Sequence, residues 1–353
     1  MIVHTGDAPR PPCDLAPPKA GWPAVFRGGR KALGMVAALC IATVALPAAA
    51  ADLVRIGVQT TGTFAWQLDV IRRHKLAAAA GLDLKTIELA SPDSGELALN
   101  GGTVDIAVLD WLWVARERAL GAKLKFYPYS SAIGAIMTKN ASSLQGIADL
   151  KGRTLSVAGG PLDKSWLIVQ AAALRKGINL KREATLQYGA PSLMFQKALQ
   201  GESDASLNFW NFCARLEAQG YRRLYDVRQA QIELGLKAPI ALTGYVFAEQ
   251  FAASHDNVVG RFLSIVKKAD DILMQSDQEW EALRPLMKAD DEATFLAYRT
   301  RTRQGLPQRP VSAEEADARE LFKAIAQISG SELVGSARDL DPDLYYHPAA
   351  DGD

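Results

Sequence analysis

The sequence predicts an α/β fold of two similar lobes with a ligand cleft between them, plus a helical C-terminal segment packed on one lobe. Three observations lead to this prediction. From residue 52 onward, short apolar runs typical of strands alternate with amphipathic helical stretches. The same order of elements then returns in the middle of the chain. The last third has helical periodicity and few strand signals.

Composition narrows the function classes. The chain has 353 residues, with 40 Lys+Arg against 39 Asp+Glu and a net charge of +1, so no sequence-wide basic field exists to hold nucleic acid. At roughly 150 residues per domain, this length predicts two domains. Three cysteines cannot form a disulfide framework. One segment near the N-terminus is apolar enough to concern a membrane, which argues against a polytopic membrane protein.

Residues 1–51 have the three parts of a cleaved signal peptide, preceded by a long proline-rich leader. Basic residues in Arg27–Lys31 precede the apolar run Ala32–Leu46, and the small residues of Pro47–Ala51 follow. The apolar run is shorter than the roughly 20 residues that span a bilayer, so a membrane anchor is the less favoured alternative. We expect cleavage after Ala51 and release into the periplasm.

The first lobe is expected to begin with residues 52–132. Its strands are expected at Leu53–Val58, Lys85–Leu89, Val104–Leu109 and Leu124–Tyr129. Its helices, each followed by a glycine that can end a helix, are expected at Phe64–Ala80, Ser94–Asn100 and Trp111–Leu120. Strands separated by helices of this length predict parallel pairing with right-handed crossovers.

Residues 133–240 repeat this order and are expected to form the second lobe. We expect strands and helices to alternate at Thr154–Val157, Ser165–Arg175, Thr185–Tyr188, Ser192–Leu199, Asp204–Leu207 and Asn211–Gln219. Individual residues keep step between the halves, for example Trp66 with Trp166 and Asp105 with Asp204. The repeat therefore predicts two lobes built alike.

Residues 241–340 are predicted to return to the first lobe as a helical segment. Amphipathic periodicity predicts helices at Asn257–Met274, Gln278–Met287, Asp291–Thr300 and Ala313–Ser329. Residues 341–353 have the composition of a frayed C-terminal tail.

One run carries a resemblance to a known family. Glu96–Asp105, ELALNGGTVD, matches the A-L-x-x-G-x-x-D segment of ABC-transporter solute-binding proteins of the nitrate/sulfonate/taurine type. The matching continues through Leu144–Leu155, Ala198–Gly201 and Asp204, so the resemblance covers most of the chain after the leader. It implies a type II periplasmic-binding-protein fold, in which a two-stranded hinge joins two lobes that close on a ligand. The chain departs from the family at Asn208–Asn211, where a proline-containing stretch is usual.

The candidate ligand-binding residues lie where strands end and helices begin. In open parallel sheets, ligands bind beyond the carboxyl ends of the strands. Two lobes that meet at such ends enclose a cleft with an apolar wall and a few convergent polar groups. The candidates are Thr60, Thr61, Thr63, Trp66, Ser94, Asp110, Trp111, Ser131, Lys164, Ser165, Trp166, Asn208 and Trp210.

The candidates also have simpler structural interpretations. Thr60–Thr63 opens a helix and is suited either to bind an anion or only to cap the helix. Lys164 could neutralise an anionic ligand or lie exposed to solvent. Asp110 could receive a ligand amine or cap the next helix. Trp66 and Trp166 hold matching positions in the two lobes, so we expect at least one to contact the ligand, with core packing as the alternative for each.

Enzyme signatures are missing from the sequence. It contains no H-E-x-x-H, C-x-x-C, G-x-S-x-G, Walker A or G-x-G-x-x-G motif. His74, His255 and His347 fall outside the predicted site loops, which argues against histidine-based acid–base or metal chemistry. We therefore expect no enzyme activity, no cofactor and no metal.

The combined hypothesis is a monomeric substrate-binding component of an ABC importer. We expect it to capture a small organic solute, anionic or partly aromatic, in the periplasm by lobe closure, and to deliver it to an ABC permease at the inner membrane. Abundant tryptophan and sparse arginine near the strand ends favour such a ligand over bare nitrate, and no nucleic acid is expected as a partner. The same fold leaves two alternatives: an exported enzyme with Asp93, Glu96 and Asp110 as candidate acids, and a sensory ligand-binding protein.

Overall fold

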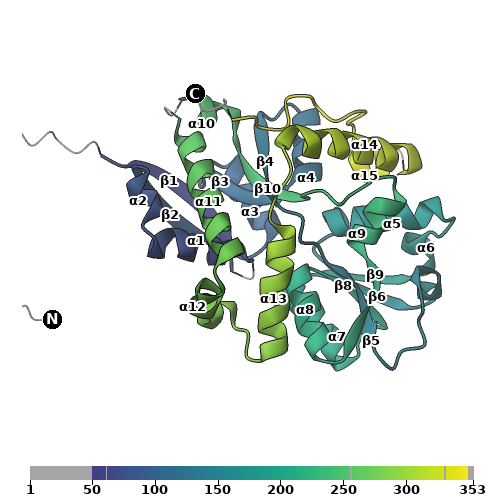
Figure 1. Ribbon diagram of the computed structural model, residues 1–353. Helices are drawn as coiled ribbons and strands as arrows, with labels where there is room; N and C mark the ends of the chain where they lie inside the picture. The colour runs from purple at the N-terminus through teal and green to yellow at the C-terminus, as the bar shows by residue number, and fades with distance from the viewer. Residues whose placement is uncertain (1–49, 61, 255–256, 330, 349–353) are drawn as a thin grey trace, which may run out of the picture. The chain divides into compact units, whose positions relative to one another are not determined.

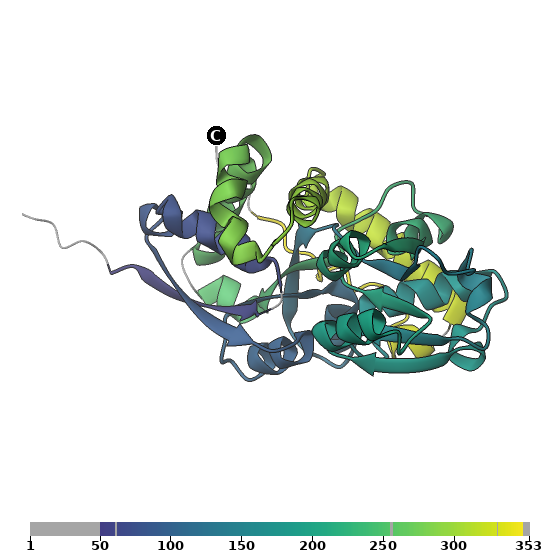
Figure 2. The same ribbon diagram turned by 90° about the horizontal axis from the view of Figure 1, so that it is seen from below.

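Two five-stranded sheets organise the part of the chain that the computed structural model describes, which is residues 50–348 except 61, 255–256 and 330 (Figure 1). The first sheet has the order β2 (Leu82–Leu89), β1 (Asp52–Gln59), β3 (Ile106–Asp110), β10 (Thr243–Ala248), β4 (Leu124–Ser130). The second has the order β7 (Thr185–Gly189), β6 (Thr154–Ala158), β8 (Ala205–Asn208), β5 (Ala135–Lys139), β9 (Tyr221–Asp226). In Figure 2 the purple-to-blue strands of the first sheet and the teal strands of the second occupy separate halves of this part. Residues 1–49, which make up nearly all of the predicted signal peptide, lie outside the described residues.

Parallel pairs in each sheet confirm the predicted α/β pattern. β1 pairs in parallel with β2 and β3, and β6 pairs in parallel with β7 and β8. Each sheet also contains strands that the sequence did not predict. β10 runs antiparallel between β3 and β4, and β5 runs antiparallel between β8 and β9. Because β5 and β10 are buried along nearly their whole length, they lack the apolar–polar alternation that distinguishes a strand from a helix.

Helices follow most strands of both lobes. Those of the first lobe are α1 (Phe64–Arg73), α2 (Leu76–Ala79), α3 (Pro92–Asn100) and α4 (Trp111–Ala119). Those of the second are the 3-10 helix η1 (Ile147–Leu150), α5 (Lys164–Arg175), α6 (Leu180–Glu183), α7 (Pro191–Gln200), α8 (Trp210–Ala218) and α9 (Val227–Glu233). The single helix predicted over Phe64–Ala80 is instead broken after Arg73, because Lys75 adopts a left-handed conformation with φ 53°.

Polar side chains near strand ends cap the helices α3, α4 and α5. Ser91 forms a reciprocal capping box at the start of α3. Asp110 Oδ1 accepts a hydrogen bond from Trp113 N at 2.8 Å, and Asp163 Oδ1 accepts one from Ser165 N at 2.9 Å. Such a cap contributes about 1 kcal/mol to stability. Each cap also holds an oxygen-bearing side chain near the carboxyl end of a strand.

The C-terminal helices contact both lobes. They are α10 (Glu249–Ser254), α11 (Val258–Gln275), α12 (Asp277–Met287), α13 (Glu292–Gly305), α14 (Val311–Ser329) and α15 (Ser331–Val334). α11 and α12 pack on α1 of the first lobe, whereas α13 packs on α8 and α14 on α5 of the second lobe. The segment therefore ties the lobes together as well as covering the first sheet. Within the described residues, no helix has the length and apolar character needed to cross a bilayer.

The C-terminal tail is bound to the first sheet, so the expectation of a frayed end is wrong for residues 341–346. Phe126 N donates to Leu344 O at 2.9 Å, and Tyr346 N donates to Phe126 O at 2.8 Å. Tyr345 is buried, and its ring packs edge-on against that of Phe126 with centroids 5.2 Å apart. The tail thus pairs with the edge strand β4, a long-range contact that local composition does not reveal.

The chain first crosses between the lobes at residues 131–134. Ser131 N donates to Gly305 O of α13 at 2.8 Å. Gly134 lies so close to the end of β8 that an added Cβ would stand 1.7 Å from Asn208 O. Only a residue without a side chain fits this approach.

The chain crosses back at residues 234–242. Ala241 N donates to the buried Glu314 carboxylate of α14 at 2.8 Å. The preceding Ile240 N donates to Gln231 Oε1 of α9 at 3.0 Å. Side chains from α9 and α14 therefore satisfy the backbone of this crossing, as a buried connection requires.

Gly134→Ala is expected to destabilise the protein strongly, because the added methyl group collides with Asn208 O. We expect a loss of roughly 2–4 kcal/mol in the free energy of unfolding, measured by thermal or urea denaturation. Gly146→Ala is the matched control, since an added Cβ there meets nothing within 4 Å. Equal stability of the two variants would contradict the close approach at the crossing.

Candidate functional site

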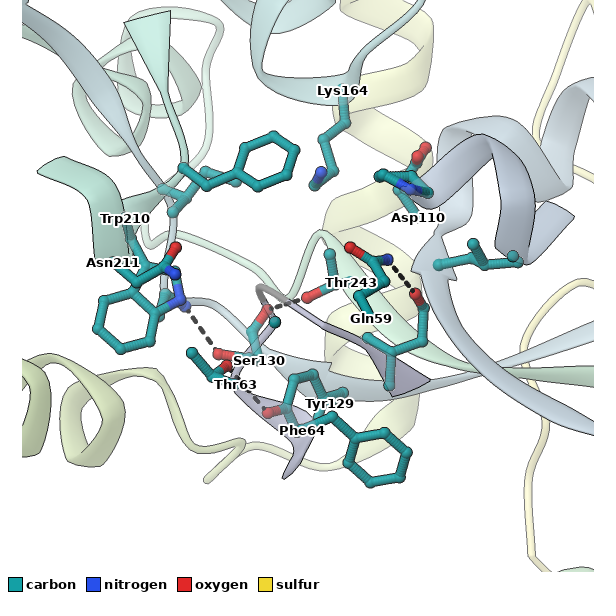
Figure 3. A pocket seen from close by; sticks show the side chains of 18 of the residues that line it. Gln59, Thr63, Phe64, Asp110, Tyr129, Ser130, Lys164, Trp210, Asn211 and Thr243 are labelled. Carbon is teal, nitrogen blue, oxygen red and sulfur yellow. Dashed lines mark hydrogen bonds between the residues drawn. The ribbon is translucent and has the colours of Figure 1, made fainter. Parts of the chain in front are cut away.

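A cavity of about 100 Å³ lies where strand ends of the two sheets meet (Figure 3). The first lobe contributes Gln59, Thr63, Phe64, Asp110, Tyr129, Ser130 and Thr243 to its lining, with smaller residues between them. The second lobe contributes Lys164, Ser165, Phe209, Trp210 and Asn211. Among the described residues that line it, Asp110 and Lys164 are the charged ones. The cavity is therefore an apolar and aromatic space with one cation and one anion.

Lys164 is a buried ammonium at the start of α5. Its Nζ lies 3.4 Å from Asp163 Oδ2 and 4.6 Å from the centroid of the Phe209 ring. Burial alone would lower the pKa of Lys164, but the carboxylates of Asp163 and Asp110 outweigh burial and raise that pKa. The group therefore stays protonated and acts as a hydrogen-bond donor, not as a nucleophile.

Asp110 caps α4, one of the two roles that the sequence left open, and it also lines the cavity, so the ligand-binding role stays a prediction. Burial raises the pKa of Asp110, while the charges of Lys164 and Arg116 act in the opposite direction. Figure 3 shows the Lys164 and Asp110 side chains at the same end of the cavity. They come from different lobes, so an attraction between opposite charges acts across the cleft.

The other end of the cavity is polar but uncharged. Thr63 Oγ1 and the Tyr129 hydroxyl lie 3.3 Å apart, and Thr243 Oγ1 donates to Ser130 O at 3.3 Å. Burial raises the pKa of Tyr129, so its hydroxyl keeps its proton. This end of the cavity therefore offers a ligand hydroxyl groups but no charged side chain.

Two helices, one from each lobe, begin at the cavity without a side-chain cap. They are α1, which follows Thr63, and α8, which follows Phe209. Their first residues, Phe64 and Trp210, line the cavity. Helix N-termini carry partial positive charge and favour anionic groups. By contrast, the carboxylates of Asp110 and Asp163 already cap α4 and α5.

The structure brings five of the predicted site residues into the cavity lining. They are Thr63, Asp110, Lys164, Ser165 and Trp210. Seven predicted residues lie outside the lining, namely Thr60, Trp66, Ser94, Trp111, Ser131, Trp166 and Asn208. Thr61 is outside the described residues. Ligand contact by any of these residues stays a prediction.

The residues outside the lining have structural partners. Trp66 is 6% exposed and belongs to the core around the first sheet, and Trp166 is 1% exposed in the core that reaches the second. Asn208 Nδ2 donates to Pro191 O at 3.0 Å. Ser94 completes the capping box of α3. Core packing and capping, the alternatives raised for such positions, describe these residues.

Several lining residues were not among the predicted candidates. Gln59 and Asn211 stand at strand ends, so the rule used for the other candidates could have found them. Tyr129 and Ser130 end β4, just before the first crossing. Thr243 begins β10, and it could not be placed because that strand was not predicted.

The described residues include no group of three or more His, Cys, Asp or Glu side chains that could hold a metal ion. His74 Nε2 lies 2.9 Å from Glu279 Oε1, and His347 Nε2 lies 2.8 Å from Glu315 Oε2. Both histidines are thus engaged in pairs away from the cavity lining. The lining presents hydrogen-bonding groups, one cation and aromatic rings, a set suited to holding a solute.

Comparison with known proteins places the chain in a family. The sequence profile of the NMT1/THI5-like family matches residues 78–279. The chain belongs to the NMT1/THI5-like family. No curated protein sequence matches this family member significantly. Its membership, together with the relatives described next, confirms the resemblance to periplasmic solute-binding proteins and supports a solute-binding role.

Solved structures resemble this NMT1/THI5-like chain along most of its length. The alkanesulfonate-binding protein SsuA from Xanthomonas axonopodis pv. citri, bound to MOPS, is 20% identical, covering 82% of this chain and 99% of its own, with a TM-score of 0.63. The periplasmic aliphatic sulphonate binding protein SsuA from Escherichia coli is 16% identical, covering 86% and 96%, with a TM-score of 0.62.

A Candida albicans gene product exhibiting the generic periplasmic binding protein structural fold is 12% identical, covering 85% and 99%, with a TM-score of 0.61. At these identities the likeness shows the fold. The bilobal periplasmic-binding-protein fold predicted for this NMT1/THI5-like chain is therefore confirmed.

Protein stability is expected to fall as pH rises from about 4.5 to about 7 because of Glu96 on α3. Burial, with help from the nearby Asp110 and Asp93 carboxylates, raises the pKa of Glu96 from its ordinary 4.5 to about 7. Between these values the folded protein binds the proton more tightly than the unfolded chain does. Ionisation in the folded state therefore costs stability, and the loss persists above pH 7.

Glu96→Gln removes this titration, so the variant should melt higher than the unchanged protein at pH 8 and at nearly the same temperature at pH 4.5. The exposed Glu88→Gln, at the end of the neighbouring strand β2, is the control, and its effect should be the same at both pH values. If the effect of Glu96→Gln on the melting temperature were the same at both pH values, the raised pKa of Glu96 would be contradicted.

Proposed function

We propose that this protein is the periplasmic solute-binding component of an ABC importer, and that it captures a small organic anion between its lobes and delivers it to a permease at the inner membrane. The observation that carries the proposal is the cavity at the meeting point of the two sheets, with one charged residue from each lobe in its lining. Membership of the NMT1/THI5-like family and the sulfonate-binding relatives support it. The signal-like N-terminus supports a periplasmic location.

The chemistry of the lining supports an organic solute rather than a bare oxyanion. Among the described residues, the lining has one ammonium, that of Lys164, and no arginine. The charge of this ammonium is already balanced in part by Asp163 and Asp110. A bare oxyanion offers no apolar surface to Phe64, Phe209 and Trp210, whereas an organic body buries apolar area worth about 25 cal/mol per Å² against them.

The arrangement offers two places that favour an acidic group on the ligand. One is formed by the uncapped starts of α1 and α8, and the other is the Lys164 ammonium, which Figure 3 shows reaching into the cavity. A hydrogen-bond donor on the ligand is favoured at Asp110. An organic molecule with one acidic group meets both requirements.

The proposal is tested by identifying what the native protein carries. Protein purified from its own periplasm without denaturation is unfolded, and the released small molecules are identified by mass spectrometry. We expect one dominant organic acid that rebinds with a stoichiometry of one by calorimetry and is recovered unchanged. Steady conversion of that molecule by the purified protein, abolished by Asp110→Asn, would instead support the exported enzyme.

Lys164→Met is expected to weaken binding of the identified solute by roughly 10- to 100-fold, since a hydrogen bond to a charged group contributes about 1.5–3 kcal/mol. Calorimetry with the co-purified molecule measures this loss. Lys176→Met is the matched control, because Lys176 pairs with Glu233 on the surface at 2.8 Å. Equal affinities of the two variants for the solute would show that Lys164 does not contribute to binding.

Inorganic nitrate and sulfate, tested at millimolar concentration, are expected to change the melting temperature no more than chloride does at equal ionic strength. Organic sulfonates and carboxylates with apolar bodies form the comparison panel. We expect hits within this panel, because binding to the folded state raises the melting temperature according to ligand affinity. A nitrate-specific rise would contradict the organic solute.

A further inference from the structure

Beside the cavity, α8 of the second lobe packs directly on helices of the first lobe. Trp210 and Ala214 of α8 belong to the same hydrophobic cluster as the core around the first sheet. They are 8% and 1% exposed. The core of one lobe therefore includes side chains of the other, and separating the lobes would expose apolar surface on both sides.

Aromatic rings make the centre of this contact. The Trp210 ring stands 6.0 Å from that of Trp66 at 89° and 5.8 Å from that of Tyr298 at 82°. These are edge-to-face arrangements, which aromatic pairs prefer. Trp66 comes from α1 and Tyr298 from α13, so the ring of Trp210 is held by two elements of the opposite lobe.

An ion pair flanks the rings. Arg301 Nη2 of α13 lies 2.9 Å from both carboxylate oxygens of Glu217, which is near the end of α8. Glu217 Oε1 also accepts from Arg223 Nε of β9 at 2.7 Å. Arg223 belongs to the same lobe as Glu217, so it fixes the carboxylate in place for Arg301.

The two sides of this contact are anchored in different lobes. On α13, Phe295 is fully buried in the first-lobe cluster, and Arg299 and Arg303 pair with Asp277 of α12 at 3.2 and 2.8 Å. On α8, Cys213 is buried with residues of β5 in a separate cluster. Movement of one lobe against the other therefore has to break the contact between α8 and α13.

We propose that Trp210, Glu217 and Arg301 form a latch that holds the lobes closed before any ligand binds. The proposal deepens the proposed function and rests on it, because a solute has to pass between the lobes to reach the cavity. Because these contacts do not involve the ligand, the latch shifts the unliganded protein toward its closed, binding-competent form. The apparent affinity then rises by the same factor as the closed population, while the rate of ligand uptake depends on how often the latch opens.

The test measures lobe separation without ligand. The protein is freed of bound solute by unfolding and refolding, and its small-angle X-ray scattering is recorded together with hydrogen exchange of α8 and α13. We expect the unchanged protein to scatter as the closed structure does. Arg301→Glu, which sets two carboxylates against each other, should lower the closed-to-open ratio about fivefold or more, with faster exchange at the α8–α13 contact.

Arg299→Glu is the matched control, since Arg299 lies on the same helix but pairs with Asp277 within the first lobe. It should leave scattering and exchange at the α8–α13 contact unchanged, and melting curves of both variants check that each is folded. The latch is refuted if the ligand-free protein scatters as an open form, or if the two variants open to the same extent. Neither result depends on solute identity, so an open ligand-free protein that still yields a co-purified solute refutes the latch and leaves the proposed function standing.

Discussion

The close approach of the two sheets at the first crossing is the constraint on which the site depends. Gly134 lies against the carbonyl of Asn208, the last residue of β8, and Ser131 is bonded to the end of α13. This approach brings the ends of β1, β3 and β4 to face the starts of α5 and α8. Without it, Lys164 and Asp110 would belong to two separate surfaces, and no enclosed cavity would form between them.

Helix capping determines where the charged side chains lie around the cavity. Asp110 and Asp163 use one carboxylate oxygen each to start a helix, which fixes them beside Lys164. The helices α1 and α8 begin without such caps. The cavity therefore has one end where Asp110 lies with Lys164, and another where the N-termini of α1 and α8 have no side-chain cap.

The sequence predicted well what is local and repeated. Glycine stops and apolar runs located the parallel strands and their helices to within a few residues, because these signals depend on neighbours along the chain. It did not predict the edge strand β9. It also did not predict β5 and β10, since strands inserted between partners from other parts of the chain are specified by those partners. The tail from Leu344 to Tyr346 was missed for the same reason.

The candidate site shows the same division. Asp110 and Lys164 were found because strand ends in α/β proteins are where ligands bind. Trp66 and Trp166 were predicted candidates because they hold matching positions in the two lobes, yet both are core residues outside the lining, whereas Trp210 lines the cavity. Placing Thr243 and Tyr129 in the site requires the register of β10 against β4, and that register cannot be derived from the order of residues along the chain.

The interleaving of the first sheet has a consequence for the order in which the protein can fold. β10 has to insert between β3 and β4, and the tail at Tyr345 has to reach back to Phe126, after the whole second lobe has been made. Contacts so distant along the chain form slowly and late. The first lobe therefore stays incomplete until residues 344–346 have been made, whereas every strand of the second sheet is available well before that point.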